Sequence, residues 1–507
     1  MALAQTLAGH RFKVAVIGGG LGGVAAGYYL RRAGIEDFAI LEKADGLGGT
    51  WRENTYPGAG CDVASHMYSY SFERHYPWRW RYAKQPEILA YVRHCAERHG
   101  IAAHVHCNAA LKSAEFDGAQ GLWHLVLVDG TECDTDFLVS AVGQLDHPAI
   151  PSIPGRDSFT GPAFHSARWD HGVDLTGKRV AVIGTGASAI QFVPEIAEQV
   201  AKLYVYQRSP GWTAPKMEKQ RSHWSAWCFD HIPGLETLDR LRLFLIMESL
   251  AFAYNGHPWA ERIARFISAM QLRLQVRDPA LRARLTPDFP IGCKRILLTS
   301  RWYKALLRPN VEVMSDGIQA ITAAGIQTTD GQTRDVDAIV YGTGFAATTF
   351  LASMRIVGRE GRELHDTWRN GADAYLGMAV SGFPNFFMIY GPNTNLGAGS
   401  IIFMLECQAR YIAQLIAMRE RAGWREVEVT RAAHEAYARE MDRRSATTTY
   451  NGNCHNWYKT ATGRNTNNWV GSCTEFRRRT RTPDMACYAV RSGGHTAVSV
   501  APLRKRA

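Results

Sequence analysis

Two short glycine patterns each follow a run of apolar residues that is typical of a buried strand. The first pattern runs through Gly18, Gly20 and Gly23, and the second through Gly184 and Gly186. Glycine at such positions allows a tight turn, lets a pyrophosphate approach the backbone, and leaves the N-H groups of the next helix facing the phosphates. The sequence therefore predicts two dinucleotide sites in one chain, against the alternative of structural glycine-rich turns.

Polar residues near these patterns suggest which nucleotides bind. Glu42 follows the first pattern at the end of a second apolar run, where a carboxylate accepts the ribose hydroxyls of an adenosine. The second pattern contains Ser188, and the apolar run after it leads to Arg208 and Ser209, where an NAD site would place an acid. A cation and a hydroxyl can bind a 2'-phosphate, so NADPH is favoured over NADH. The alternative for Arg208 is an ordinary surface arginine.

Three charged residues are candidates for chemistry. Lys294 and Arg295 are adjacent, so their side chains can serve two anionic centres, and arginine keeps its charge at working pH. Asp62 ends a glycine-rich loop that also offers Thr50 and Trp51 for polar and stacking contacts. The plainer alternatives are a solvated Lys-Arg turn and a capping role for the aspartate.

The linker between the two glycine patterns contains four residues whose spacing matters. These are Phe159, Gly161, His165 and Trp169, and a Gly-Pro pair places the start of the segment in a turn. The spacing F-x-G-x-x-x-H-x-x-x-W just before a second dinucleotide pattern resembles the fingerprint of type I Baeyer-Villiger monooxygenases. These are flavoenzymes of the flavin-containing monooxygenase superfamily. For an isolated His-Trp pair, sealing a domain edge is the alternative.

The resemblance implies FAD and NADPH as cofactors and oxygen insertion next to a ketone carbonyl, which gives an ester or lactone. It implies that Lys294 meets the NADPH phosphate, that Arg295 faces the flavin, and that Asp62 orients Arg295. It adds three further cofactor-binding residues, Gln144, Asn393 and Trp457. Many relatives carry a basic residue close to the aspartate, whereas this chain has Ala59-Gly60, so one charge near the flavin is missing.

Two rival functions remain open at this point. An enzyme on the same scaffold could oxygenate a soft nitrogen or sulfur atom. A flavoprotein that senses or binds without turnover is the second rival. Ketone-dependent NADPH oxidation would exclude the second, and the sequence does not identify the ketone. The expected partners are a ketone and O2, with no nucleic acid, no membrane span and no metal.

The fold class predicted from these patterns is α/β, with two Rossmann-like dinucleotide-binding domains. Residues 1–147 and 335–490 are assigned to the FAD domain, and 148–334 to the NADPH domain, with a helical insertion at about 215–285. Most aromatic residues of the insertion, such as Trp224 and Phe266, are expected in the core, and the alternative for some of them is the lining of a substrate pocket. Residues 491–507 are expected to form a mobile tail.

The composition is that of an ordinary globular protein, with 507 residues, 46% hydrophobic and 21% charged. The net charge of +11 is spread along the chain, so anionic cofactors are favoured over nucleic acid. Ten cysteines show no C-x-x-C pair and no grouping with histidine, which favours a reducing compartment and argues against dithiol chemistry. A cytoplasmic monomer or small homo-oligomer is expected.

Overall fold

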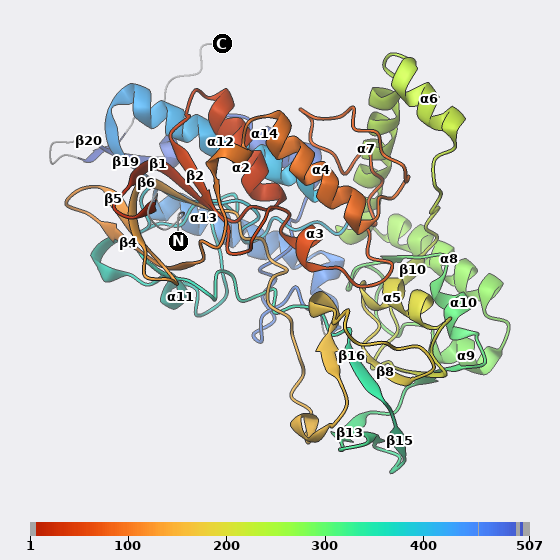
Figure 1. Ribbon diagram of the computed structural model, residues 1–507. Helices are drawn as coiled ribbons and strands as arrows, with labels where there is room; N and C mark the ends of the chain where they lie inside the picture. Colours follow the sequence, from red (N-terminus) through yellow and green to blue (C-terminus); the bar gives the residue numbers. More distant parts are fainter. Residues whose placement is uncertain (1–6, 455, 493–496, 500–507) are drawn as a thin grey trace.

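The computed structural model describes residues 7–454, 456–492 and 497–499, with the backbone alone for residue 230 and residues 497–499. Two mostly parallel sheets, each flanked by helices, dominate the molecule (Figure 1). The predicted α/β class with two Rossmann-like units is confirmed. The N-terminal residues 1–6 and the basic run near the C-terminus lie outside the described residues.

The first sheet has eight strands in the order β17-β4-β5-β6-β1-β2-β3, with β18 paired to β6. Its strands are β1 Arg11–Ile17, β2 Phe38–Leu41, β3 Val105–His106, β4 Leu111–Asp117, β5 Leu122–Leu127, β6 Glu132–Ser140, β17 Arg355–Val357 and β18 Phe386–Met388. Strand β1 is parallel to both β2 and β6. Alternate residues of β1 enter two different core clusters, because helices cover one face and the β4–β5 hairpin and later loops cover the other.

Helices α2 Leu21–Arg32, α4 Gln85–Arg98 and α12 Ile401–Ala422 contribute to the larger core cluster of this unit. The other helices here are α3 Thr50–Glu53, α11 Leu364–Thr367, α13 Arg431–Ser445 and α14 Cys473–Arg479. Helix α12 lies beside α2 and ends at Gly423, which has φ 65° as a left-handed cap requires. Within the described residues, α12 alone is long and apolar enough to cross a bilayer, but 67% of its apolar window is buried inside the protein.

The second sheet has five parallel strands in the order β12-β9-β8-β16-β7. Its strands are β7 Ala163–His165, β8 Arg179–Ile183, β9 Lys202–Tyr206, β12 Val311–Met314 and β16 Ala338–Tyr341. Helices α5 Ala189–Ile196 and α10 Trp302–Leu306 pack in the core on one face, and a three-stranded antiparallel sheet covers the other. That small sheet is formed by β13 Ile318–Ile321, β14 Gly325–Thr328 and β15 Thr333–Asp335.

Strand β16 shows that the predicted domain boundary at 335 is too early. It pairs with β8, whereas the chain rejoins the first sheet only at β17. Strands β6 and β16 occupy equivalent places, each parallel to the first strand of its own sheet. The two strands have similar sequences, and a sequence pattern does not tell which sheet a strand joins.

The segment predicted as a helical insertion contains α6 His223–His231, α7 Leu235–Tyr254, α8 Pro258–Gln275 and α9 Pro279–Arg284. A two-stranded pair flanks it, β10 Thr213–Ala214 with β11 Leu297–Leu298. The expectation that its aromatic residues are core is wrong for most of them. Trp224 is 71% exposed and Phe266 is 64% exposed. Hydrophobic periodicity shows that a helix has an apolar face, but it does not show whether the rest of the protein covers that face.

The predicted tail is also partly structured. Strand β20 Tyr488–Ser492 pairs antiparallel with β19 Trp424–Val429 and with β21 Ala497–Ser499. Residues 491–492 and 497–499 are therefore strand. Residues 493–496 and 500–507 of the predicted tail lie outside the described residues.

Candidate active site

The centre of the candidate site is an ion pair between Arg295 and Asp62. Arg295 donates from Nε and Nη2 to Asp62 Oδ2 over 3.0 and 2.8 Å. Its third group, Nη1, donates to the carbonyl oxygen of Leu396 over 3.3 Å. Two segments far from Arg295 in the sequence, those of Asp62 and Leu396, therefore fix the plane of its guanidinium.

Both members of this pair are charged at neutral pH. Burial alone would raise the pKa of Asp62, but the charge and hydrogen bonds of Arg295 outweigh it and hold that pKa below its usual range. Asp62 is in turn the largest cause of the raised pKa of Arg295. The two side chains keep 27% and 26% of their exposure, so the pair borders an opening and is not sealed in the core.

Tyrosines surround the pair, and sequence reasoning missed them. Tyr254 accepts a hydrogen bond from the backbone N-H of Ile296, next to Arg295, over 3.1 Å. Tyr450 lies 5.6 Å from the rings of both Tyr254 and Tyr458. Burial raises the pKa of all three, so they stay neutral and keep water away from one side of the guanidinium. They come from α7 and from a much later segment of the chain, and no local pattern marks them.

A second cation near Asp62, Lys216, was also missed. Its side chain is only 4% exposed, pairs with Glu218 over 2.7 Å, and lies 5.4 Å from the Tyr82 ring centroid. Its charge helps to lower the pKa of Asp62. Lys216 therefore adds positive charge near Asp62, although Glu218 partly balances it.

Cys293, which precedes the Lys294-Arg295 pair, forms a disulfide with Cys454. Asn456 donates to the carbonyl oxygens of Cys293 and Tyr450 over 2.9 and 3.2 Å, so this C-terminal segment is fastened beside the active-site segment. The cysteine spacing, which favoured a reducing compartment, gave no sign of this bond. Their separation of 161 residues leaves no spacing signal in the sequence.

The first glycine turn has the geometry that a phosphate site needs. Gly18 has φ 105°, and an added Cβ would lie 2.9 Å from the carbonyl oxygen of Ala141. At Gly23 an added Cβ would lie 2.0 Å from the carbonyl oxygen of Gly18, so only glycine fits. Helix α2 begins after Gly20 with no side-chain cap, which leaves its first N-H groups for a ligand.

Glu42 lies at this turn, as predicted, and is 6% exposed. Its carboxylate accepts from the N-H of Gly19 over 2.6 Å and from the N-H of Ala44 over 2.8 Å. Each oxygen accepts one such bond and keeps a further lone pair. Glu42 therefore holds the turn in shape and can still accept from a ribose.

The second glycine turn is more open. Gly184 has φ 107°, and an added Cβ would lie 2.4 Å from the carbonyl oxygen of Gly342. A Cβ added at Gly186 would have only that same oxygen within 4 Å, at 3.9 Å, which leaves space beside the turn. Ser188 caps α5 without a side-chain hydrogen bond. The hydroxyl of Ser188 interacts with that of Tyr56, so the backbone N-H groups are what this turn offers to a second nucleotide.

Arg208, Ser209 and Lys294 come together although Lys294 is 85 residues away from Ser209 in the sequence. Lys294 Nζ donates to Ser209 Oγ over 2.6 Å and lies 4.5 Å from the Phe289 ring centroid. Burial first, and then the charge of Arg208, lower the pKa of Lys294. Neither cation forms an ion pair within the part of the chain that the structure describes. Asp288 contributes negative charge near Lys294 but forms no ion pair with it among the described residues. Two neighbouring cations without a paired acid are suited to a phosphate.

Thr50 and Trp51 begin the short helix α3, directly beside the first glycine turn. Thr50 is exposed. Trp51 Nε1 donates to the hydroxyl of Tyr68 over 3.0 Å. The contact fixes the indole near Asp62, which comes from the same loop.

The other three predicted cofactor residues occupy loops around α12. Gln144 Nε2 donates to the carbonyl oxygens of Tyr390 and Gly391 over 3.0 and 3.2 Å. Asn393, with φ 54°, donates to the carbonyl oxygen of Asn465 over 3.0 Å. Trp457 is half-buried, with its ring 4.6 Å from that of Tyr458. Gln144 and Asn393 thus brace loops, and Trp457 lies in the segment fastened by the disulfide.

The predicted linker forms the edge strand of the second sheet. Strand β7 pairs with β16, and His165, 3% exposed, lies at its end opposite Tyr341. Phe159 packs with the cluster on one face of the sheet, and Trp169 packs against Phe192 on the other. These residues therefore hold both faces of the sheet, and burial lowers the pKa of His165, which keeps it neutral.

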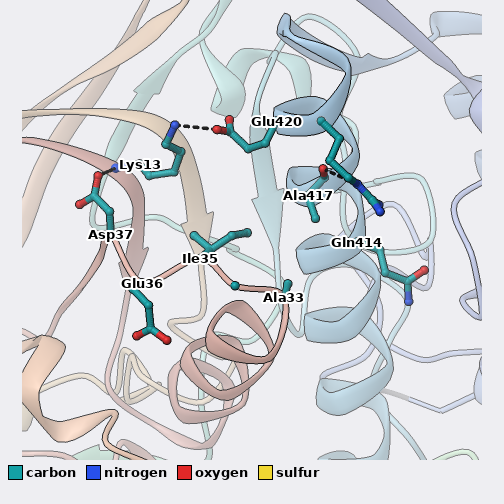
Figure 2. Close-up of a pocket in the computed structure, with 10 residues that line it drawn as sticks. Lys13, Ala33, Ile35, Glu36, Asp37, Gln414, Ala417 and Glu420 are labelled. Atoms are coloured by element: carbon teal, nitrogen blue, oxygen red, sulfur yellow. Dashed lines mark hydrogen bonds and ion pairs between the residues drawn. The ribbon is translucent and has the colours of Figure 1, made fainter.

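Figure 2 shows a pocket away from this site, with a volume of about 530 Å³. Lys13 and Glu420 bridge it over 2.7 Å, at the C-terminal ends of α2 and α12. Those ends lie roughly a helix length, about 18 Å for α2, from the glycine turn. Among the described residues, no group of His, Cys, Asp or Glu side chains is arranged to hold a metal ion.

The disulfide yields a direct prediction about thiols. Ten cysteines are present, and eight are free in the structure. Protein denatured without reductant should therefore react with a thiol reagent at eight sites, and at ten after reduction. Cys454→Ser should leave nine reactive thiols without reductant, since Cys293 is then released. Ten reactive thiols in the unreduced protein would rule out the bond.

Comparison with known proteins agrees with this arrangement. Residues 15–232 match the family model described as pyridine nucleotide-disulphide oxidoreductase. The chain is 43% identical over 480 residues to a Baeyer-Villiger monooxygenase of Streptomyces coelicolor, covering 94% of this chain and 92% of that protein. It is 41% identical to one of Pseudomonas aeruginosa, covering 95% and 92%.

Solved structures give the same result. A steroid monooxygenase bound to NADP is 33% identical, with a TM-score of 0.84, and the match covers 95% of this chain and all of that one. Cyclohexanone monooxygenase from Rhodococcus sp. Phi1 bound to NADP+ is 26% identical, with a TM-score of 0.86 over 96% of this chain and all of that one. Two glycine turns, a phosphate-suited cation cluster and a fixed arginine thus occur in a chain that belongs to the Baeyer-Villiger monooxygenase family.

Proposed function

We propose that this flavoprotein monooxygenase uses NADPH and FAD to insert one atom of O2 next to a ketone carbonyl, giving an ester or lactone. The observation that carries the proposal is the Arg295–Asp62 pair, a fixed cation beside an opening and between two nucleotide turns. The similarity to two Baeyer-Villiger monooxygenases and to a steroid monooxygenase bound to NADP supports the same activity.

FAD fits the first unit. When bound, it supplies the activation of O2, which side chains cannot provide. The turn at Gly18, Gly20 and Gly23 would hold the pyrophosphate, and Glu42 the ribose. Ser400 Oγ, at the start of α12, and Asn468 Nδ2 are buried with no hydrogen-bond partner in the described residues. Polar atoms of the cofactor that reach these two groups would satisfy them.

NADPH fits the second unit. Its pyrophosphate would lie at the turn of Gly184 and Gly186, with Ser188 at the start of α5. Arg208, Ser209 and Lys294 would bind the 2'-phosphate, since two cations and a hydroxyl offer charge-assisted hydrogen bonds. Because Lys294 and Arg295 are adjacent in the chain, the 2'-phosphate contact and the candidate catalytic arginine lie on the same segment.

Arg295 would stabilise the reaction at the ketone. Negative charge develops at the carbonyl oxygen when the carbonyl carbon is attacked, and a fixed guanidinium in a partly dry site lowers the energy of that state. Arginine does not lose its proton at working pH. Asp62 positions the guanidinium and balances its charge when no substrate is present. The tyrosines around the pair exclude water.

The same cation favours a ketone over a soft nitrogen or sulfur atom. Oxygenation of nitrogen or sulfur needs an electrophilic oxygen donor, whereas attack at a carbonyl needs a nucleophilic one. A permanent positive charge stabilises the anionic, nucleophilic form. A panel of cyclic, linear and aryl ketones beside a thioether, with products identified by mass spectrometry, would define the substrate class.

Arg295→Ala is the direct test of this proposal. The variant should bind FAD and be reduced by NADPH at a near-normal rate, because neither step uses the guanidinium. Ester formation should fall about 100-fold or more, as when one charge-stabilising donor is lost, with hydrogen peroxide released instead. Stopped-flow reduction and product quantification measure both. Arg355→Ala, at an arginine 57% exposed and distant in the first unit, is the control. Near-normal ester yield from folded Arg295→Ala would remove Arg295 from the mechanism.

Arg208→Ala tests the assignment of the phosphate site. The loss of a charge-assisted contact should weaken NADPH by about 10- to 100-fold, with little effect on NADH. The ratio of kcat/KM values for the two nucleotides is the readout. Arg308→Ala, at a 40% exposed arginine of the same unit, should leave the ratio unchanged. Equal use of both nucleotides by the wild type would contradict the assignment.

A further inference from the structure

Helices α6, α7 and α8 expose an apolar surface that the proposed activity does not use. Fifteen of the nineteen exposed large hydrophobic side chains in the described residues lie between Trp224 and Leu274. Helices α7 and α8 pack against each other (Figure 1); α8 contacts β10, whereas Leu243 and Tyr254 of α7 pack in the larger core cluster of the first unit. Exposed apolar residues are common singly, but a gathering of this size marks an interaction surface.

The hydrogen bonds of helix α8 hold its apolar side chains in the exposed position. Trp259, Ile263, Phe266, Met270 and Leu274 are spaced as one helical stripe and are 40–74% exposed. The buried face of the same helix is smaller and more polar, and includes Ser268 and Gln271. Gln271 is fixed there, because it donates to the carbonyl oxygen of Thr299 over 2.6 Å and accepts from Thr213 over 3.1 Å. Rotating the helix to bury its apolar stripe would break these bonds.

The charge around the stripe is positive. Arg262, Arg265 and Arg273 of α8 are exposed, whereas the one acid of this helix, Glu261, is half-buried. The acids of α7 are engaged within the protein, since Asp239 pairs with His66 over 2.8 Å and Glu248 accepts from the N-H of Cys473 over 2.7 Å. A second copy of this chain, related by a two-fold axis, would place arginines near arginines. An anionic surface complements them.

A cation-lined pocket of about 360 Å³ lies at the base of α6. Its lining includes Arg74, His75, Arg79 and His223, together with the acid Glu236, which pairs with His75 over 2.9 Å. Trp224 and Trp227 of α6 stack with ring centroids 5.3 Å apart and are both exposed. Tryptophan is enriched where protein meets the boundary between lipid tails and headgroups.

We propose that α6–α8 dock this enzyme on an anionic lipid surface. The apolar stripe of α8 and the exposed apolar residues of α6 and α7 enter the boundary between headgroups and acyl chains. Arg262, Arg265 and Arg273 face lipid phosphates, and the pocket at the base of α6 accepts a headgroup. Docking is peripheral, since these helices lie along the surface and do not span it.

The test is vesicle flotation of the FAD-loaded enzyme. It should float with vesicles of phosphatidylcholine mixed with phosphatidylglycerol, less with phosphatidylcholine alone, and less as salt is raised. Arg262→Gln/Arg265→Gln should weaken binding roughly 30-fold, because each cation near an anionic membrane contributes about one factor of five. Ile263→Gln/Leu274→Gln should abolish flotation. The NADPH oxidation rate without vesicles should be unchanged in both variants, which shows that they are folded.

Val128→Gln is the matched control, because Val128 is 68% exposed but lies at the β5–β6 turn of the first unit. It should float like the wild type. Failure of the wild type to bind either vesicle would overturn the proposal, as would equal binding to both. Sedimentation without vesicles tests whether the surface instead binds a second copy of the chain. A dimer that Ile263→Gln/Leu274→Gln converts to monomer, in a protein that does not float, would assign the surface to a second copy and overturn the proposal.

Discussion

One ion pair, Arg295 with Asp62, joins the two halves of this molecule where chemistry would occur. Asp62 belongs to the loop after α3 in the first unit, and Arg295 to the segment that enters β11, beside the second. Each charge is partly removed from water, so each depends on the other, and breaking such a pair by removing one partner leaves an uncompensated charge. The contact that fixes the cation is one of several between the two units, since Gln191 of the second unit also exchanges hydrogen bonds with Gly60 of the first.

The residues around the pair help to keep Arg295 and Asp62 together. The disulfide between Cys293 and Cys454 and the hydrogen bonds of Asn456 hold the later segment against the arginine. The tyrosines supply neutral, buried walls, and Lys216 adds positive charge on the side of Asp62. A cation kept in place before substrate arrives needs no reorganisation during the reaction, which is the main advantage of a preorganised site.

Features fixed by local geometry were predictable from the sequence. The turns at Gly18 and Gly184 need positive φ and lack room for a side chain, so glycine spacing revealed them. Features made by tertiary packing were not predictable. Lys216 and the disulfide depend on contacts between distant segments, and the outward aromatic face of α6–α8 depends on which side of a helix the rest of the protein covers. The predicted domain boundary put β16 in the wrong unit, because β6 and β16 share one sequence pattern.

The central claim is that Asp62 acts through Arg295, and a double-mutant cycle on ester yield per NADPH oxidised tests it most directly. Asp62→Ala alone should lower the yield less than Arg295→Ala, because the guanidinium remains but is less well positioned. In the double variant, loss of Asp62 should add no further decrease to that of Arg295→Ala. FAD content and the rate of reduction by NADPH, measured on all four proteins, separate this effect from unfolding. Independent, additive losses from the two substitutions would contradict the account, because Asp62 would then act without Arg295.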